Sequence, residues 1–313
     1  FRVLARDVTM KTSFSIIGLD RSGISVALAL AQREKDAAAI GWDSDPQKIK
    51  AAQSWNAFSA LPTKLEEATK SVDLLLINQP LNLVQETFNQ IKKWVRKDTL
   101  IIYFSSLPAT VAVWAKQALP DSVHFIALTP SLNPKYLDDP DEQTPHADLF
   151  EHSRMFISHP AELPASIVQI ADEVARLLGA EPCYAALEEV NGLQAITQQL
   201  PAISTLVLMD EVLHEPGWRD ASQLAGAELV RALQRLDAID PGNLSQILIA
   251  NQENCSRVIN NLQNSLSVLA SLLMAKDNQK LQEKLSQLQA AYEDFLKKRK
   301  STSLVKGSVL ERN

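Results

Sequence analysis

The chain has 313 residues, of which 46% are hydrophobic and 22% charged, and its net charge at pH 7 is −6. This length allows two domains with sizeable cores, and the composition is that of an ordinary globular protein. The negative charge argues against a nucleic-acid-binding surface. No apolar run approaches the roughly 20 residues of a membrane span, so we expect no membrane partner.

The two cysteines and the start of the chain bear on localisation. Cys183 and Cys255 lie far apart without CxxC spacing, so we expect small core residues of a cytoplasmic protein rather than a disulfide or a zinc site. The first residues, FRVLARDVT, contain no hydrophobic segment typical of a signal peptide. We interpret Met10 as the natural start and residues 1–9 as upstream or cloning-derived sequence.

The first half of the chain alternates predicted strands and helices. Continuous apolar runs, typical of strands buried on both faces, lie at 13–18, 37–43, 72–78, 99–104 and 122–128. Helical patterns lie between them near 22–34, 46–54, 82–95 and 108–118. After a long loop at 130–150 come a strand at 155–159, a helix at about 163–178 and a strand at 182–187. This order predicts an α/β domain over 10–187, with a doubly wound, mostly parallel sheet.

The strand signal stops at about Leu187. Helical patterns follow at 188–214, 221–236, 243–275 and 278–299, so we predict an all-α domain over 188–299 and a loose tail over 300–313. The last helix has an apolar seam at alternating four- and three-residue steps, formed by Leu281, Leu285, Leu288, Tyr292 and Phe295. Two interpretations of this seam remain open: packing within the chain, and a dimer interface.

The stretch GLDRSGISVALAL (18–30) lies where a dinucleotide-binding loop of the pattern G-x-G-x-x-G belongs, between the first strand and helix. Gly18 and Gly23 hold the first and third glycine positions, but Asp20 holds the second, where the backbone should approach the pyrophosphate. A carboxylate there can accept hydrogen bonds from free N–H groups of the helix. We favour this capping role. In the alternative, Arg21 and Ser22 compensate and hold the phosphates.

Polar residues also follow the second and third predicted strands. Asp43 lies about 25 residues after Gly18, close to the spacing of the acidic residue that binds the adenosine ribose. If a cofactor binds, the absence of a nearby arginine favours NAD over NADP; otherwise Asp43 is a solvated strand end. The amides of Asn78 and Gln79 are expected to bond either a ligand at the sheet edge or the loop backbone.

Further stretches add to this loop: GWD (41–43), ADLFE (147–151), LLGAEP (177–182), LEEVNGLQAITQQLPA (187–202), GWRDAS (217–222) and ILIANQENCSRVI (247–259). In this order and spacing, from Phe14 to Leu273, they resemble the prephenate/arogenate dehydrogenase family of tyrosine biosynthesis. The resemblance implies a Rossmann domain, a helical dimerisation domain that forms a homodimer, and an active site between them. Such enzymes oxidise a ring hydroxyl with NAD(P)+, and loss of the ring carboxylate drives aromatisation.

The resemblance also places the family's functional positions on this chain. Ser106 matches the family's serine, but Thr129 stands at its catalytic histidine, and a threonine hydroxyl is a poor base near neutral pH. Asn191 lies in the position of a His-Asp pair, and Gln223 replaces the arginine that binds substrate. Arg219 remains, either in an ion pair with Asp220 or Asp210 or as the cation that faces a substrate carboxylate.

Two functions follow as hypotheses. The family implies NAD-dependent oxidative decarboxylation of a cyclohexadienyl hydroxy acid, catalysed through Ser106 and Thr129. The alternative is a non-catalytic homodimeric relative that binds another metabolite, such as a small carboxylate, or another protein. The replacements at Asp20, Thr129 and Gln223 affect the phosphate cradle, the base and the substrate cation, and therefore bring ordinary prephenate turnover into question.

Overall fold

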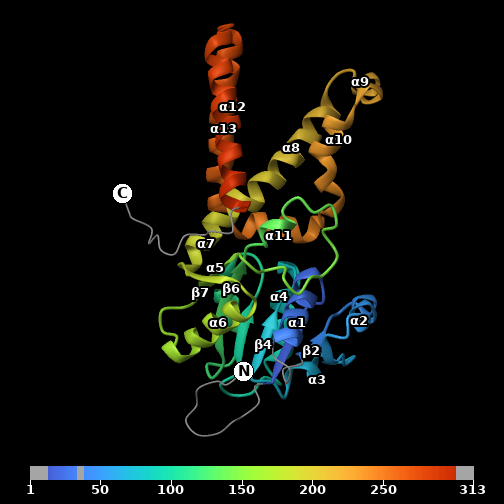
Figure 1. Cartoon of the computed structure of the whole chain (residues 1–313), viewed down its shortest axis with the longest axis vertical. Helices are drawn as coiled ribbons and strands as arrows, with labels where there is room; N and C mark the ends of the chain where they lie inside the picture. Colours follow the sequence, from blue (N-terminus) through green and yellow to red (C-terminus); the bar gives the residue numbers. More distant parts are fainter. Residues whose placement is uncertain (1–12, 34–38, 301–313) are drawn as a thin grey trace.

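The computed structural model describes residues 13–33 and 39–300. Residues 1–9 and the tail after Lys300, whose roles the sequence analysis addressed, lie outside the described residues. An eight-stranded sheet, with helices on both faces, forms one end of the molecule, and helices alone form the other (Figure 1). This arrangement confirms the predicted fold class, a doubly wound, mostly parallel sheet followed by an all-α region.

The sheet has the order β3-β2-β1-β4-β5-β6-β7-β8. Its strands are β1 (Phe14–Ile17), β2 (Ala39–Trp42), β3 (Phe58–Ala60), β4 (Leu74–Ile77), β5 (Leu100–Tyr103), β6 (His124–Pro130), β7 (Arg154–Ser158) and β8 (Glu181–Tyr184). Neighbouring strands from β3 through β6 pair in parallel, β7 pairs antiparallel with β6, and β8 runs parallel to β7. The order reverses at β1, so the carboxyl ends of β1 and β4 flank the switch point where ligands bind in such sheets.

Two apolar cores cover the two faces of the sheet. The helices are α1 (Arg21–Arg33), α2 (Pro46–Gln53), α3 (Leu65–Thr69), α4 (Leu81–Ile91), α5 (Pro108–Ala118) and α6 (Ala165–Leu177). Residues of α1 and α6 pack in the first core, and residues of α4 and α5, such as Phe88 and Val111, pack in the second. The strand β3 and the helix α3 are not predicted from the sequence, because such short elements have too few residues to show a period.

The remaining helices follow the sheet in the chain. They are α7 (Leu187–Gln194), a π-helical turn (Ala195–Gln199), α8 (Leu200–His214), α9 (Trp218–Leu224), α10 (Ala227–Leu233), α11 (Pro241–Ala250), α12 (Gln252–Met274) and α13 (Asn278–Lys300). The single helix predicted over 221–236 is wrong. It is broken at Gly226, whose backbone is extended, and ends in a 3-10 turn, Gln234–Ala238. No helix in the described ranges is long and apolar enough to cross a membrane.

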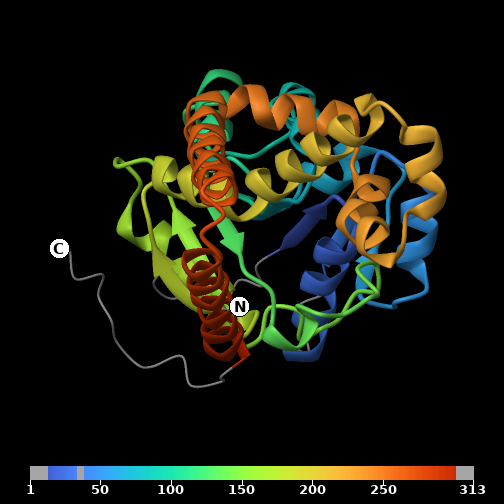
Figure 2. The ribbon, with the colours of Figure 1, turned by 90° about the horizontal axis from the view of Figure 1, so that it is seen from above.

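The helical region extends away from the sheet in two arms (Figure 1). Helix α8 leads to α9 at the far end of one arm, and α10 returns toward α11. Helices α12 and α13 form the second arm, which Figure 2 shows from above. The end of α13 returns to the sheet region, where Arg299 donates a hydrogen bond to the Leu132 carbonyl (3.3 Å) and Lys300 pairs with Asp138.

Candidate functional site

The turn between β1 and α1 needs its two glycines for steric reasons. Gly18 has φ +101°, and a Cβ on it would lie 1.9 Å from the Asn78 carbonyl oxygen. A Cβ on Gly23 would lie 2.0 Å from the Gly18 carbonyl oxygen. Neither backbone position can accept a side chain, because the neighbours that it would meet are themselves backbone. The glycines therefore preserve the turn of a dinucleotide-binding fold whether or not a nucleotide binds.

Asp20 caps the helix that begins at this turn, so the favoured interpretation is confirmed. Its Oδ1 accepts hydrogen bonds from the Gly23 N–H (3.0 Å) and from the Asn78 side-chain amide (2.5 Å). The same amide of Asn78 lies 3.4 Å from the Gly18 carbonyl oxygen. A carboxylate thus occupies the N-terminus of α1, where a bound pyrophosphate would meet free N–H groups and the positive end of the helix dipole.

Arg21, the proposed substitute for phosphate binding, is engaged by the loop after β6. We call residues 131–153 the β6–β7 loop. Arg21 Nε donates to the Thr144 carbonyl (3.0 Å), its Nη2 lies 3.4 Å from Asp139 Oδ2, and its guanidinium lies 5.5 Å from the centre of the Tyr136 ring. Ser22 is half-buried beside it. The side chain that would have to hold phosphates is therefore already held by protein groups.

Asp43 is buried, so its interpretation as a solvated strand end is wrong. Its Oδ2 accepts from the Leu19 N–H (2.8 Å), its Oδ1 accepts from the Asp45 N–H (2.9 Å), and Lys48 Nζ lies 3.9 Å from Oδ2. These bonds join the end of β2 to the turn after β1. A role in ribose binding stays a prediction.

Asn78 and Gln79 make contacts within the protein. Asn78 bonds the Asp20 carboxylate and the turn backbone, and Gln79 Oε1 accepts from the Thr87 hydroxyl on α4 (2.7 Å). Both residues are buried. Of the two alternatives for these amides, the contacts favour the protein scaffold over a ligand.

Helix α7 is held by side-chain amides to the segment that follows β5. Leu107 is fully buried in the left-handed conformation (φ 57°, ψ 57°), a backbone state that costs about 1–3 kcal/mol. Its N–H donates to Gln194 Oε1 (2.7 Å), and the Ala109 N–H donates to Asn191 Oδ1 (3.3 Å). Gln194 therefore orders the loop that contains Ser106, and Asn191 binds the first turn of α5 beside it.

Ser106 lies in the loop that follows β5, and Thr129 lies near the end of the neighbouring strand β6. Ser106 is half-buried, and its carbonyl accepts a hydrogen bond from the Tyr103 hydroxyl (2.7 Å). Burial raises the pKa of Tyr103, so this phenol stays neutral. Thr129 is buried near the end of β6, and its hydroxyl has no hydrogen-bond partner within the described residues.

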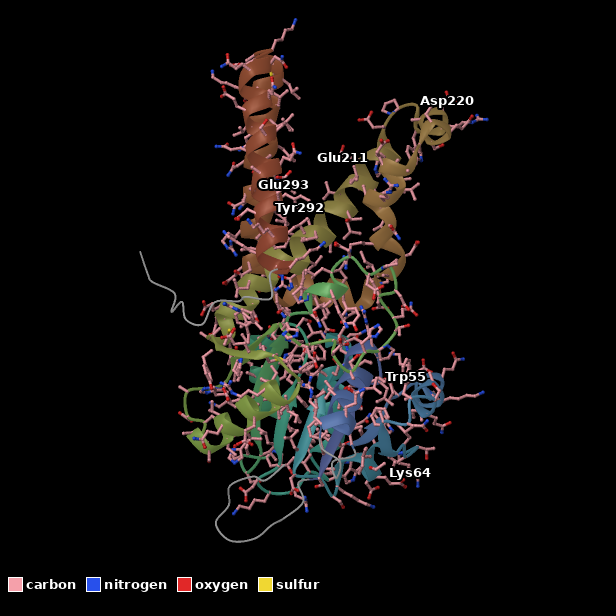
Figure 3. All side chains as sticks on the ribbon, in the orientation of Figure 1. Trp55, Lys64, Glu211, Asp220, Tyr292 and Glu293 are labelled. Carbon is pink, nitrogen blue, oxygen red and sulfur yellow. The ribbon has the colours of Figure 1, made fainter. Side chains whose placement is uncertain are left out.

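The structure does not bring Arg219 and Gln223 to the carboxyl edge of the sheet. Both are exposed on α9, at the far end of the α8–α10 arm; the neighbouring Asp220 is labelled there in Figure 3. The expected ion pair is wrong: among the described residues Arg219 has none, and Asp210 lies 3.4 Å from His214. Sequence reasoning could not place α9, because the direction in which α8 leaves the sheet depends on tertiary packing.

Three further buried amides, not predicted from the sequence, lie on the helices around Asn191: Gln194, Gln199 and Asn251. Asn251 Nδ2 donates to the Asn191 carbonyl (3.0 Å) and to Gln199 Oε1 (2.8 Å), while Gln194 binds Leu107 as above. Gln194 and Gln199 flank and end the π-helical turn, a rare conformation that is frequent at functional sites. The stretches LEEVNGLQAITQQLPA and ILIANQENCSRVI contain these residues, but polar letters in a helical pattern do not reveal burial.

The sheet order and the glycine turn after β1 define a Rossmann-type α/β protein with a helical C-terminal region. The family model for the nucleotide-binding domain of prephenate dehydrogenase matches residues 26–181. The chain belongs to the prephenate dehydrogenase family. A search of curated proteins found no match.

Solved structures share the fold over nearly the whole chain. Prephenate dehydrogenase from Aquifex aeolicus, in complex with hydroxyphenyl propionate and NAD+, is 17% identical with a TM-score of 0.78, covering 92% of this chain and 100% of its own. Arogenate dehydrogenase from Synechocystis is 16% identical with a TM-score of 0.71, covering 91% and 100%. A putative prephenate dehydrogenase from Corynebacterium glutamicum is 15% identical with a TM-score of 0.71, covering 96% and 92%.

Proposed function

We propose that this chain is a ligand-binding member of the family that does not carry out NAD-dependent dehydrogenation. One observation carries the proposal: Asp20 Oδ1 accepts from the Gly23 N–H and the Asn78 amide at the N-terminus of α1. The carboxylate uses a donor that a pyrophosphate would need, and its charge repels the phosphates. The residues of the cradle therefore fit NAD poorly. Thr129 in place of a basic histidine points the same way.

The second candidate is an NAD-dependent dehydrogenase of tyrosine biosynthesis. The Aquifex aeolicus relative was solved with NAD+ and hydroxyphenyl propionate, and this chain keeps the glycine turn and an acidic residue, Asp43, at the end of β2. NAD would be the expected dinucleotide. This function would need a phosphate site that tolerates Asp20 and a base other than Thr129.

Calorimetric titration with NAD separates the two candidates. We expect no detectable binding by the natural chain, and binding at least about tenfold tighter by Asp20→Gly, because removing one close like charge is worth about 1.4 kcal/mol or more. Asp20→Asn keeps a side-chain acceptor for the Gly23 N–H and tests the charge alone. Asp277→Gly is the matched control, since Asp277 accepts from the Lys280 N–H (3.0 Å) at the start of α13, away from the cradle.

Micromolar binding of NAD by the natural chain would contradict the proposal. If Asp20→Gly also fails to bind NAD, the obstacle to NAD binding would be the β6–β7 loop, which binds Arg21. An assay of prephenate with NAD, followed by NADH absorbance, tests the missing base. A turnover rate of about 1–10³ per second, as in ordinary enzymes, would establish the second candidate.

We also infer that the chain forms a homodimer through α12 and α13. Side chains of the α13 seam are exposed by 54–60% (Leu285 56%, Leu288 56%, Tyr292 60%, Phe295 54%), so packing within the chain does not cover them. A groove of about 410 Å³ between the two helices is lined largely by leucines of α12 and α13, including Leu269 and Leu285. An apolar stripe along an antiparallel helix pair is suited to a second copy of the same pair.

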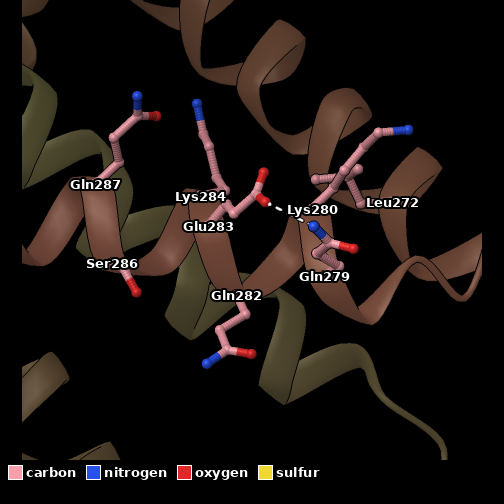
Figure 4. A pocket seen from close by; sticks show the side chains of 8 residues that line it. All are labelled: Leu272, Gln279, Lys280, Gln282, Glu283, Lys284, Ser286 and Gln287. Carbon is pink, nitrogen blue, oxygen red and sulfur yellow. Dashed lines mark hydrogen bonds between the residues drawn. The ribbon is translucent and has the colours of Figure 1, made fainter.

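The surroundings of this stripe are polar, as at the rim of a protein interface. Figure 4 shows the adjoining hollow, where Gln279 donates to Glu283 (3.1 Å) beside Gln282, Ser286 and Gln287. In Figure 3, Tyr292 and Glu293 are labelled on the same arm. These features support association of two arms side by side.

A cytoplasmic location is part of the proposal. Cys183 is half-buried in β8 and Cys255 is buried in α12, and both are free thiols. Burial raises the pKa of each thiol, which keeps it protonated and unreactive, as suits a reducing compartment.

A further inference from the structure

The two ends of the β6–β7 loop are anchored next to each other. The Asn133 N–H donates a hydrogen bond to the Leu149 carbonyl (2.8 Å), which joins the start of the loop to its end. Leu149 and Phe150 are buried in the core shared with α1 and α6. We call residues 134–147, between these anchors, the tip of the loop. A surface loop whose ends lie close together in this way is an Ω-loop, a class that is frequently functional.

The tip lies on the first turns of α1 and is bound there by polar groups. The Thr144 carbonyl accepts from Arg21 Nε (3.0 Å), and Asp139 Oδ2 lies 3.4 Å from Arg21 Nη2. The His146 N–H donates to the Ser25 hydroxyl (3.0 Å), one turn further along the helix. Only 12% of the Arg21 side chain is exposed. The tip therefore covers Arg21 at the place where α1 begins.

The last turn of α13 holds the same loop. It contacts the 3-10 turn Pro134–Tyr136 of the tip, and Figure 2 shows the end of α13, in dark red, beside the green loop. Lys300 pairs with Asp138 in the tip, and Arg299 donates to the Leu132 carbonyl just before it (3.3 Å). The two segments carry opposite charges, so they attract one another. The acidic residues of the tip are Asp138, Asp139, Asp141 and Glu142, and the basic residues at the end of α13 are Lys297, Lys298, Arg299 and Lys300.

The tip is held more weakly than the anchors of the loop. Between residues 137 and 143 every residue except Asp139 is exposed, and single ion pairs at a surface contribute little to stability. Leu149 and Phe150 are fully buried, so the anchors are costly to expose. Segments with few buried apolar contacts open locally while the rest of a protein stays folded. The tip is such a segment, and its anchors are not.

We propose that the β6–β7 loop is a strap that closes over the start of α1, and that the last turn of α13 holds this strap closed. In the closed state the tip binds Arg21 and covers the first turns of α1. In the open state the Arg21 guanidinium is free and these turns are exposed to solvent. The pair between Lys300 and Asp138 forms only when the tip is in place, so it shifts the equilibrium toward the closed state. The inference goes beyond the proposed function, because it concerns access to the turn and holds with or without a nucleotide or a dimer.

The test is labelling of arginines in the full chain with phenylglyoxal, followed by mass spectrometry. Arg176, which is exposed by 66% on α6, is the internal reference, and Arg21 should react more slowly than Arg176 in the natural chain. Lys300→Glu removes an ion pair and repels Asp138, so it should speed the labelling of Arg21 by about two- to fivefold relative to Arg176. Combining Lys300→Glu with Asp138→Lys restores an attractive pair and should return the labelling to its natural rate.

Lys280→Glu is the matched control. It makes the same change of charge in α13 but at the other end of the helix, where Lys280 pairs with Asp277 (2.9 Å), and it should leave the labelling of Arg21 unchanged. Hydrogen exchange gives a second readout, which separates opening of the strap from general unfolding. In Lys300→Glu the His146 amide, which is bonded to Ser25 in the closed state, should exchange faster, while the amides of β7 keep their protection.

Three results would overturn the inference: equal labelling of Arg21 and Arg176 in the natural chain, no effect of Lys300→Glu on either readout, or no recovery in the variant with the reversed pair. A rise in the exchange of β7 equal to that of His146 would also overturn it, because the loop would then open only when the domain unfolds. None of these measurements uses NAD, so their outcome is independent of the titration that tests the proposed function.

Discussion

At the scale of single residues, the turn after β1 separates the requirements of the fold from those of the cofactor. Gly18 and Gly23 are fixed by backbone atoms about 2 Å from where a Cβ would be. Asp20 is under no such constraint, since its side chain points to the helix N-terminus and makes its own bonds there. A protein can therefore keep Gly18 and Gly23 for packing while a residue such as Asp20, between them, removes the turn's capacity to bind phosphate.

Gly23→Ala is expected to lower the free energy of unfolding by about 1–3 kcal/mol, because the new methyl group would collide with the Gly18 carbonyl. Gly192→Ala is the matched control. Gly192 is also helical, but a Cβ there would meet only Asn254 Oδ1 at 3.6 Å, so alanine should stabilise by up to about 1 kcal/mol. Urea unfolding monitored by circular dichroism measures both. Equal stability of the Gly23 variant and the natural chain would show that the turn can yield.

At the scale of elements, local hydrogen bonds order the β6–β7 loop, and the ordered loop contacts α1. Asp141 Oδ1 accepts from the N–H groups of Gln143 and Thr144 (both 3.0 Å), and its Oδ2 accepts from the Thr144 hydroxyl. Thr144 then offers its carbonyl to Arg21 (3.0 Å). Tyr136 stacks on His146 with ring centres 4.4 Å apart, which braces the other side of the loop. The loop thus reaches the nucleotide turn through Arg21.

The order of the segment from Asp141 to Thr144 should depend on pH. The Thr144 hydroxyl, followed by the backbone N–H groups of Gln143 and Thr144, lowers the pKa of Asp141 to about 2. A lowered carboxyl pKa gives a contribution to stability that is present above the unfolded pKa of about 4 and is lost as the pH falls through about 2. Hydrogen-exchange protection of Gln143 and Thr144 should fall over that window. Asp141→Ala should show low protection at every pH, and a pH-independent result in the natural chain would contradict this account.

At the scale of the whole molecule, both helical arms carry large apolar side chains that the rest of the chain leaves exposed. The seam predicted on the last helix exists, and Leu281 is partly covered, but Leu285, Leu288, Tyr292 and Phe295 are not. Large apolar patches with a polar rim mark sites of association. We therefore expect the helical region to complete its core when a second copy packs on these side chains.

Leu288→Asp is expected to shift the chain from dimer to monomer, with a loss of about 2 kcal/mol or more of association free energy, because a charge would be buried in the interface. Light scattering coupled to size-exclusion chromatography measures the mass. Gln287→Asp, the neighbouring position in the polar hollow of Figure 4, adds the same charge outside the seam and should leave a dimer. A monomeric natural chain, or a dimer that tolerates Leu288→Asp, would reject the interface.

The sequence determined the elements and the class of fold, because buried parallel strands and helical periods are written in local patterns. The runs at 72–78 and 99–104 contain β4 and β5, and the pattern at 108–118 coincides with α5. It also determined the carboxylate of Asp20 at the helix start, since capping needs only near neighbours. Tertiary structure alone decided which polar side chains meet. Arg219 matched a family motif yet lies at the end of an arm. By contrast, β7, which begins at Arg154, and α7, which ends at Gln194, pack against one another. Such meetings depend on strand register and helix direction, which arise from long-range packing and have no period to read along the chain.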